Sequence, residues 1–290
     1  CRPRIRPLLA AEYSPFYGIE KGAVLQEARV FHEQQLDPRR CQQVITKLLY
    51  LICQGETFTS KEATEVFFAV TKLFQNKDAN LRRMVYLIIR EMSPGSDEVI
   101  IVTSSLMKDM TSNNPLFQAN AIRVLSSIID SSLLQQIERF FKSSVVSKDE
   151  NVASAALVAG LRLAPYNIDI IKRWASEVQE AVQSRHPMVQ AHAVALLHKL
   201  RQSDRLAVSK LVTTLTRGSV RSSMAQCLLV RYVSQVIRET QGQMGEARPF
   251  YDYLEQCMRH KSDMVIFEAA RAVTQLNGVT SAELHLAVSV

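Results

Sequence analysis

Three histidines within a short stretch of the chain raise the question of a metal site. His186, His192 and His198 all lie in or beside one predicted helix. An ion such as zinc needs imidazoles on one helix face, as in pairs four residues apart. The six-residue spacing of His192 and His198 puts them on different faces. We therefore expect structural or surface roles for these histidines, and no metal or other cofactor.

The cysteines and serines give no sign of catalysis either. Cys1, Cys41, Cys53, Cys227 and Cys257 are odd in number and include no CxxC pair, which argues against a disulfide framework or a zinc site. All except Cys1 lie in apolar helical patterns, so we expect them to be buried in a reducing compartment. The sequence contains no GxSxG and no GxxxxGK[ST] motif, and we expect no enzymatic activity.

Polar residues recur immediately before predicted helices, where they resemble binding residues. There a side-chain oxygen would accept hydrogen bonds from N–H groups that the first helical turn leaves unpaired. We therefore interpret four of them as helix caps: Asp78, Asn114, Asp149 and Asp263. Arg82 and Arg83 follow the first cap. A phosphate contact is conceivable for them, but a solvated role or a contact between repeats is the favoured interpretation.

These polar breaks belong to a repeated unit in which an amphipathic helix opens on an apolar residue. Successive opening residues are 35 to 37 positions apart: Leu81, Phe117, Val152 and Val189. A period of this size is typical of stacked helix pairs of the HEAT or armadillo type. No strand-like alternation is sustained, and even the β-branched run 99–102 fits a helix. We predict an all-α, HEAT/armadillo-like α-solenoid, a right-handed superhelix of helix pairs.

Apolar spacing and turn residues predict the individual helices. Asp37-Pro38 starts one helix and Gly55 ends it, and Thr59 or Ser60 caps the next. A loop is expected over 240–249. The other predicted helices are 20–35, 81–92, 97–110, 116–129, 133–146, 152–163, 169–184 (after a break at Pro165), 189–200, 205–217, 220–239, 251–258 and 265–276.

The helix over 97–110 carries two apolar stripes. The first consists of Val99, Val102, Leu106 and Met110, and the second of Ile100, Thr103, Ser104 and Met107. Because only one stripe can face the partner helix fully, the other is a candidate for docking a protein. Packing between adjacent repeats explains the second stripe equally well.

Composition and charge restrict the classes of partner. The chain has 290 residues, a net charge of +7 and 47% hydrophobic residues, enough for a continuous core between repeats. No apolar run is long enough to span a membrane. Residues 1–15 lack a secretory signal, and we expect a disordered tail or a non-native remnant there. The remaining positive charge is too dilute to indicate nucleic acid, but allows a weak preference for an anionic membrane surface or an acidic partner.

Several segments resemble the adaptin and coatomer large-chain family. The helix over 81–92 and the Asn-Pro helix start over 114–123 are similar to those of both groups. Four further segments closely resemble coatomer in particular: 21–31, 101–106, 171–174 and 204–210. The resemblance runs from about Ser14 to Val290.

The resemblance implies the N-terminal trunk of a COPI vesicle-coat subunit, acting as a non-enzymatic scaffold. Such trunks bind a small coat chain, ζ-COP, and the GTP form of an Arf-family GTPase, together with other coatomer subunits. It also implies a cytoplasmic protein, peripheral on Golgi membranes and COPI-coated vesicles through its partners, in Golgi–ER retrograde and intra-Golgi transport. By repeat register, the GTPase contacts would be Ile100, Thr103, Ser104, Met107, Thr64, Phe67, Phe68 and Thr71. The nucleotide would belong to the GTPase.

Another HEAT scaffold, such as a nuclear transport receptor or a phosphatase scaffold, remains the alternative. Transport receptors usually repeat Trp and Asn on their inner face, whereas this chain has only Trp174. An enzyme would need a converging site that the sequence lacks. We expect residues 16–290 to form one solenoid trunk, truncated at its C-terminal end, so that the natural protein continues.

Overall fold

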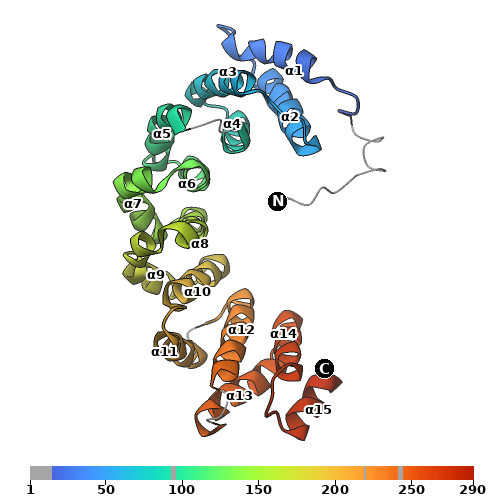
Figure 1. The fold of residues 1–290 in the computed structure, drawn as a ribbon, viewed down its shortest axis with the longest axis vertical. Coiled ribbons are helices and arrows are strands. Elements are labelled where there is room, and N and C mark those ends of the chain that lie inside the picture. The colour runs from blue at the N-terminus through green and yellow to red at the C-terminus, as the bar shows by residue number, and fades with distance from the viewer. Residues whose placement is uncertain (1–14, 93–95, 219, 241–243) are drawn as a thin grey trace. The chain divides into compact units, whose positions relative to one another are not determined.

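The chain folds into helices throughout the part that a computed structural model describes, which comprises residues 15–92, 96–218, 220–240 and 244–290. The side chains of 93–101 and 241–247 lie outside the described residues. Within the described ranges the elements are α-helices and short 3-10 helices, and no strand is found (Figure 1). The all-α prediction is therefore confirmed.

The helices group into two compact units, and the chain passes from the first to the second between Ile129 and Asp130. In the first unit, α2, α4 and α6 pack side by side in one layer, while α3 packs on α4 and α5 on α6 (Figure 1). Its elements are α1 (Lys21–Glu27), η2 (Ala28–His32), α2 (Pro38–Gln54), α3 (Ser60–Thr71), η3 (Lys72–Gln75), α4 (Ala79–Met92), α5 (Ser96–Met110) and α6 (Pro115–Ile128).

The second unit repeats the arrangement. Its layer consists of α8, α10, α12 and α14, and the helices between them in sequence pack behind it (Figure 1). The elements are α7 (Ser131–Val145), α8 (Glu150–Lys172), α9 (Ala175–Ala181), α10 (Pro187–Arg201), α11 (Arg205–Thr216), α12 (Ser223–Glu239), α13 (Met244–Met258), α14 (Asp263–Thr274) and α15 (Ser281–Ser289). Both units are stacked helix pairs of the solenoid type.

The predicted polar breaks are double caps. Before α8, the hydroxyl of Ser147 accepts from the backbone N–H of Asp149 (3.3 Å). The Asp149 carboxylate then accepts from the N–H groups of Asn151 and Val152 (2.9 and 3.2 Å). Ser112 and Asn114 do the same before α6. Helices α6 and α8 thus begin directly after caps that the sequence pattern identifies.

The predicted cap at Asp263 is wrong. The cap position belongs to Ser262, whose side chain makes no capping bond, and Asp263 is already the first helical residue. His260 replaces the usual serine, since its Nδ1 accepts from the Ser262 N–H (3.0 Å). The acidic side chain still stabilises the positive end of the helix dipole from this position.

Two helix boundaries near prolines have different outcomes. The predicted break near Pro165 is confirmed two residues later: the segment labelled α8 consists of two helical stretches that meet at a kink at Asn167 (φ −138°, ψ 43°). Helix α13 begins at Met244 instead of 251 and includes Pro249. A proline within a helix removes one backbone hydrogen bond. In α13 the burial of Leu254 (0% exposed) favours the helix on the C-terminal side of Pro249.

Long polar side chains at one repeated position tie first helices to the chain before them. The fourth residue of α4, α6, α10 and α12 donates a hydrogen bond to a carbonyl six or eight residues upstream. Three of these bonds come from glutamine: Gln118 to Ser112, Gln190 to Val182 and Gln226 to Val220. The fourth comes from Arg82, which reaches the carbonyl of Phe74 at the end of η3.

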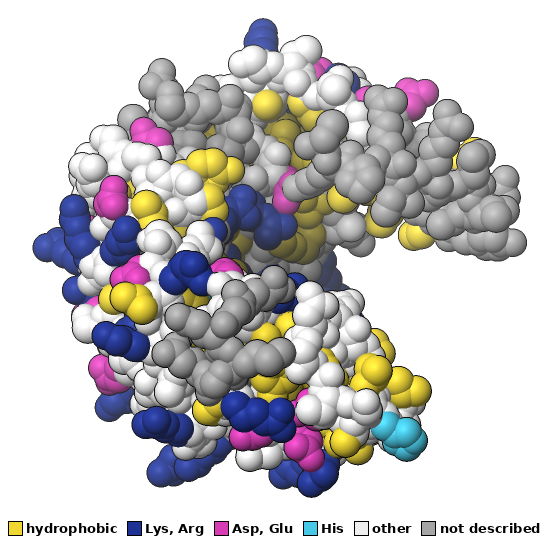
Figure 2. Space-filling model, turned by 60° about the horizontal axis from the view of Figure 1, so that its bottom comes forward, with side chains coloured by type: hydrophobic (Ala, Val, Ile, Leu, Met, Phe, Trp, Pro, Cys, Tyr) yellow, Lys and Arg dark blue, Asp and Glu magenta, His cyan; other side chains and the backbone are white. Residues whose placement is uncertain are grey.

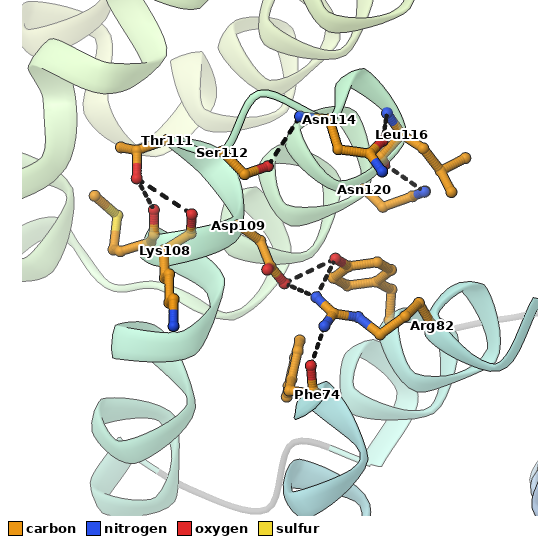
Figure 3. A network of polar contacts seen from close by, with 11 residues as sticks. Phe74, Arg82, Lys108, Asp109, Thr111, Ser112, Asn114, Leu116 and Asn120 are labelled. Atoms are coloured by element: carbon orange, nitrogen blue, oxygen red, sulfur yellow. Dashed lines mark hydrogen bonds and ion pairs between the residues drawn. The ribbon is translucent and has the colours of Figure 1, made fainter. Parts of the chain in front are cut away.

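Arg82 brings a charge into the core of the first unit (Figure 3). Its side chain is 5% exposed. The guanidinium donates to the Asp109 carboxylate of α5 and to the Tyr86 hydroxyl (2.9 Å), which itself donates to Asp109 (2.8 Å). The same group lies 4.9 and 4.4 Å from the ring centroids of Phe74 and Phe117. One buried cation therefore joins the end of the α3–η3 segment to α4, α5 and α6. The favoured interpretation of Arg82, a contact between repeats, is confirmed.

Burial also affects the phenol of this network. Removal from water raises the pKa of Tyr86 far above its ordinary value, and the hydrogen bond that it donates to Asp109 adds to the effect. Tyr86 therefore stays protonated and serves as a donor to the carboxylate. Arg83, the next residue after Arg82, is exposed and bonds only to Asn80 within its own helix (3.3 Å) among the contacts of the described residues.

We expect Asp109→Leu to destabilise the first unit by about 3–5 kcal/mol, because it leaves the Arg82 guanidinium buried without its counter-ion. The double variant Arg82→Met/Asp109→Leu should recover most of the loss, since both charges are gone. Urea unfolding followed by circular dichroism measures both. The matched control is Arg83→Met, which should change little. An equal, small effect of Asp109→Leu and Arg83→Met would contradict a buried charge pair.

Candidate functional site: exposed faces of α3 and α5

Two of the three neighbouring histidines serve the packing of the second unit. His192 Nδ1 lies 2.9 Å from the Ser154 hydroxyl, and the His198 ring stacks on Tyr232 with centroids 3.6 Å apart. Burial lowers the pKa of both imidazoles, so they are mostly neutral at pH 7. In the described part of the chain, no group of three or more His, Cys, Asp or Glu side chains has the geometry to hold a metal ion.

The cysteines are mostly core residues. Cys41, Cys227 and Cys257 are buried, and burial raises the pKa of each thiol, to about 11 for Cys257. Such thiols stay protonated and unreactive. The prediction is wrong for Cys53, which is exposed. The buried face of α2 runs through Leu48 and Leu51, and Cys53 follows on the opposite side of the helix.

The first candidate face belongs to α3. A capping box starts this helix: the Thr59 hydroxyl accepts from the Glu62 N–H, and the Glu62 carboxylate accepts from the Thr59 N–H. Thr64, Phe68 and Thr71 then lie on one side of α3 and are partly exposed. The Thr71 hydroxyl is used within the helix, since it donates to the Phe68 carbonyl (2.8 Å).

Phe67 does not belong to this face. It is 1% exposed and packs in the core, with its ring edge-on to that of Phe68 at 6.2 Å between centroids. The register transferred from related chains placed both phenylalanines at the surface. Adjacent helical residues point about 100° apart, so only one of the two can face outward. We therefore remove Phe67 from the predicted contact residues.

The second candidate face belongs to α5. The first stripe is inward, as predicted for the residues described: Val102, Leu106 and Met110 are at most 4% exposed. In the second stripe, Ser104 is exposed and Met107 is partly exposed. Thr103 is 7% exposed and faces inward, which corrects its predicted place in the stripe. Ile100 belongs to α5 by its backbone, but its side chain lies outside the described residues.

The buried Arg82 network positions these two faces. Asp109 lies two residues after Met107 on α5, and Phe74 lies three residues after Thr71, in η3. Because Arg82 contacts both Asp109 and Phe74, the C-terminal ends of α5 and of the α3–η3 segment are fixed to the same guanidinium (Figure 3). The sequence did not reveal this pairing, since the two charges are 27 residues apart. The only features of the sequence that pointed to the pair were an acidic residue in α5 and an arginine directly after the apolar residue that opens the predicted helix.

The exposed residues of α3 and α5 have a composition suited to binding a protein. We use the name α3–α5 face for the exposed and partly exposed candidate residues of the two helices together: Thr64, Phe68 and Thr71 of α3, and Ser104 and Met107 of α5. It combines an aromatic ring and a flexible thioether with small polar groups, a composition typical of protein docking surfaces. In the view of Figure 2, Lys and Arg side chains are spread among acidic and uncharged groups and do not gather into one large patch. None of the helices in the described ranges combines the length and apolar composition that a membrane span requires.

Comparison with known proteins assigns the family. A family model described as the adaptin N terminal region matches residues 20–290. The chain is 69% identical to the coatomer subunit gamma of Arabidopsis thaliana over 281 residues, which is 96% of this chain and 32% of that protein. It is 49% identical to the human coatomer subunit gamma-2 over 277 residues, again 96% of this chain and 32% of the relative. The predicted resemblance to coatomer is confirmed, and the relatives are γ subunits.

A structural comparison agrees on the fold. A chain in a homology model of the full-length AP-3 complex matches with a TM-score of 0.55 at 14% identity, covering 91% of this chain and 49% of that one. At this identity the likeness shows the solenoid fold alone. The present chain spans about a third of the length of the coatomer relatives that it matches. From the family match over residues 20–290, the chain belongs to the adaptin N-terminal family.

Proposed function

We propose that this chain is the N-terminal trunk of a γ subunit of the COPI coat and works as a non-enzymatic scaffold. The observation that carries the proposal is the 69% identity to a coatomer γ subunit over 96% of the chain. The proposed setting is the cytoplasmic surface of Golgi membranes and COPI vesicles, in Golgi–ER retrograde and intra-Golgi transport. The family match gives no support to the alternatives of a nuclear transport receptor or a phosphatase scaffold.

The proposed first partner is an Arf-family GTPase in its GTP form, bound at the α3–α5 face. In such GTPases the γ-phosphate orders two switch loops, and hydrolysis releases them. A surface that fits only the ordered loops binds one nucleotide state more tightly and so converts nucleotide state into attachment. Three side chains support the choice of this face: Phe68 and Met107 are partly exposed, and Ser104 is exposed. Such residues allow close approach of an apolar partner loop.

The proposed second partner is the small chain ζ-COP, alongside other coatomer subunits. Support comes from the similarity to coatomer γ subunits and from apolar side chains that water still contacts. Leu284 and Val288 of α15 are 45% and 75% exposed. Covering such side chains removes apolar surface from water and stabilises the complex. Membrane association would follow from these partners.

We expect Met107→Asp to weaken binding of the GTP-loaded GTPase by roughly 10- to 100-fold, because it places an unpaired charge in a desolvated contact. Phe68→Asp should have a similar effect. Isothermal titration of each variant against the GTPase loaded with a non-hydrolysable GTP analogue measures the loss. The matched control is Met188→Asp, the same change at a methionine 41% exposed on α10 of the second unit. Wild-type affinity in folded Met107→Asp and Phe68→Asp would place the site elsewhere.

We expect ζ-COP to raise the thermal midpoint of this chain, because a ligand that binds only the folded state stabilises it by about 2.7 kcal/mol at a hundredfold excess over Kd. Differential scanning calorimetry over a ζ-COP titration measures the shift. An unrelated protein of similar size serves as the control and should have no effect. The absence of a concentration-dependent shift at saturating ζ-COP would count against this partner.

A further inference from the structure

A small cleft between α12 and α14 in the second unit has three arginines in its wall. Arg231 and Arg238 come from α12 and Arg271 comes from α14. Glu268 and Gln275 of α14 also line the cleft, which encloses about 160 Å³. Neither the docking of a GTPase on the first unit nor the packing of the helices accounts for three cations at this point.

A buried carboxylate organises the cleft. Glu268 is 6% exposed and binds two guanidinium groups at once. Arg231 donates from Nε to one carboxylate oxygen (2.6 Å) and from a terminal nitrogen to the other (3.3 Å), and Arg271 donates to the first oxygen (2.6 Å). The hydrogen bond from Arg231 is the main reason why the pKa of Glu268 is lowered, so the carboxylate is ionised at pH 7. Both arginines are therefore held in fixed positions on either side of the cleft.

Among the described residues, the cleft has positive charge that no acidic side chain neutralises and N–H donors that no protein acceptor uses. Three guanidinium charges against one carboxylate charge leave two positive charges. Arg238 contacts Gln275 (3.5 Å), a neutral amide, and the ion pairs of the described residues give it no acidic partner. An arginine carries five N–H donors. The contacts with Glu268 and Gln275 use two from Arg231 and one each from Arg238 and Arg271, so most donors remain open to a ligand.

We propose that this cleft binds the phosphate group of an anionic ligand. A dianionic phosphate matches the two positive charges, and its oxygens match the forked donors of arginine. A cleft of about 160 Å³ suits one compact group better than an extended acidic segment. Because Glu268 already orders two of the three arginines, less side-chain entropy is lost when the ligand binds.

The phosphate has two possible sources: a soluble phosphate compound or a lipid headgroup. Helix α14 also carries exposed apolar side chains: Phe267 and Met264 are 67% and 50% exposed. Phe267 precedes Arg271 by about one helical turn. A soluble phosphate compound would leave these side chains exposed to water, whereas a lipid surface would cover them. The experiment therefore includes both forms.

The first test is titration of the whole chain with inorganic pyrophosphate at constant ionic strength, followed by calorimetry. The informative variant is Arg238→Gln, which leaves the Arg231–Glu268–Arg271 cluster intact. We expect it to weaken pyrophosphate binding at least about tenfold, the value of one hydrogen bond to a charged group. The matched control is Arg162→Gln, at an exposed arginine of α8, which should bind as the wild type does. Equal affinity in all three proteins would overturn the proposal.

Two further titrations separate the ligand classes. An acetylated Asp-Asp dipeptide should bind much more weakly than pyrophosphate, and equal binding with the same dependence on Arg238 would overturn the phosphate assignment in favour of an acidic protein segment. Phosphatidylcholine vesicles with and without phosphatidic acid are then compared by flotation. Arg238-dependent binding to the phosphatidic acid vesicles identifies a lipid headgroup as the source. Pyrophosphate binding without vesicle binding identifies a soluble phosphate compound.

Discussion

The structure depends on one constraint: a single helix pair of this chain cannot bury its own apolar face. Each pair must be covered by the next, and most of the residues that open the first helices are therefore core residues, whereas Phe117 is partly exposed. Leu81, Val152 and Val189 are at most 4% exposed. Gly160 shows how close the packing is, since a Cβ there would lie 2.7 Å from a methyl group of Leu196 and 3.2 Å from Trp174. Such stacking creates long helix faces instead of a central pocket, which suits a protein that binds other proteins.

Within this stack, the fourth residue of α4, α6, α10 and α12 satisfies an upstream carbonyl in one of two ways. Gln118, Gln190 and Gln226 each satisfy an upstream carbonyl with a neutral amide. At the same position of α4, Arg82 satisfies Phe74, but its charge then needs a counter-ion in the core. Asp109 supplies it from α5, with Tyr86 as a further donor. A buried ion pair is weak evidence for stability, because desolvation offsets much of the attraction. Its geometric consequence is clearer: α5 is fixed to α4 by directional contacts that a glutamine would not require.

The sequence predicts what is local and misses what joins distant segments. Caps such as Asp149 and the capping box at Thr59 involve neighbours within three residues, so helix starts were predictable. The side of a helix that faces outward was not predictable to the same accuracy, because an error of one residue rotates the predicted side-chain direction by about 100°. Phe67 and Thr103 were misplaced for this reason, whereas Phe68 and Ser104 next to them are at least partly exposed. Proline was overestimated as a helix breaker at Pro249, whereas the predicted break near Pro165 is present as a kink at Asn167.

The same rotation explains why the α3–α5 face is small. Most of the apolar residues of α3 and α5 that the structure describes are needed for the core, and only Ala63, Phe68 and Met107 among them remain partly exposed. A small apolar contact gives modest affinity, and it can favour one partner conformation only if its own geometry does not adapt to the other. Fixing α5 and the α3–η3 segment to one buried guanidinium limits such adaptation. The rigidity of the core and the selectivity proposed for the surface therefore have the same physical origin.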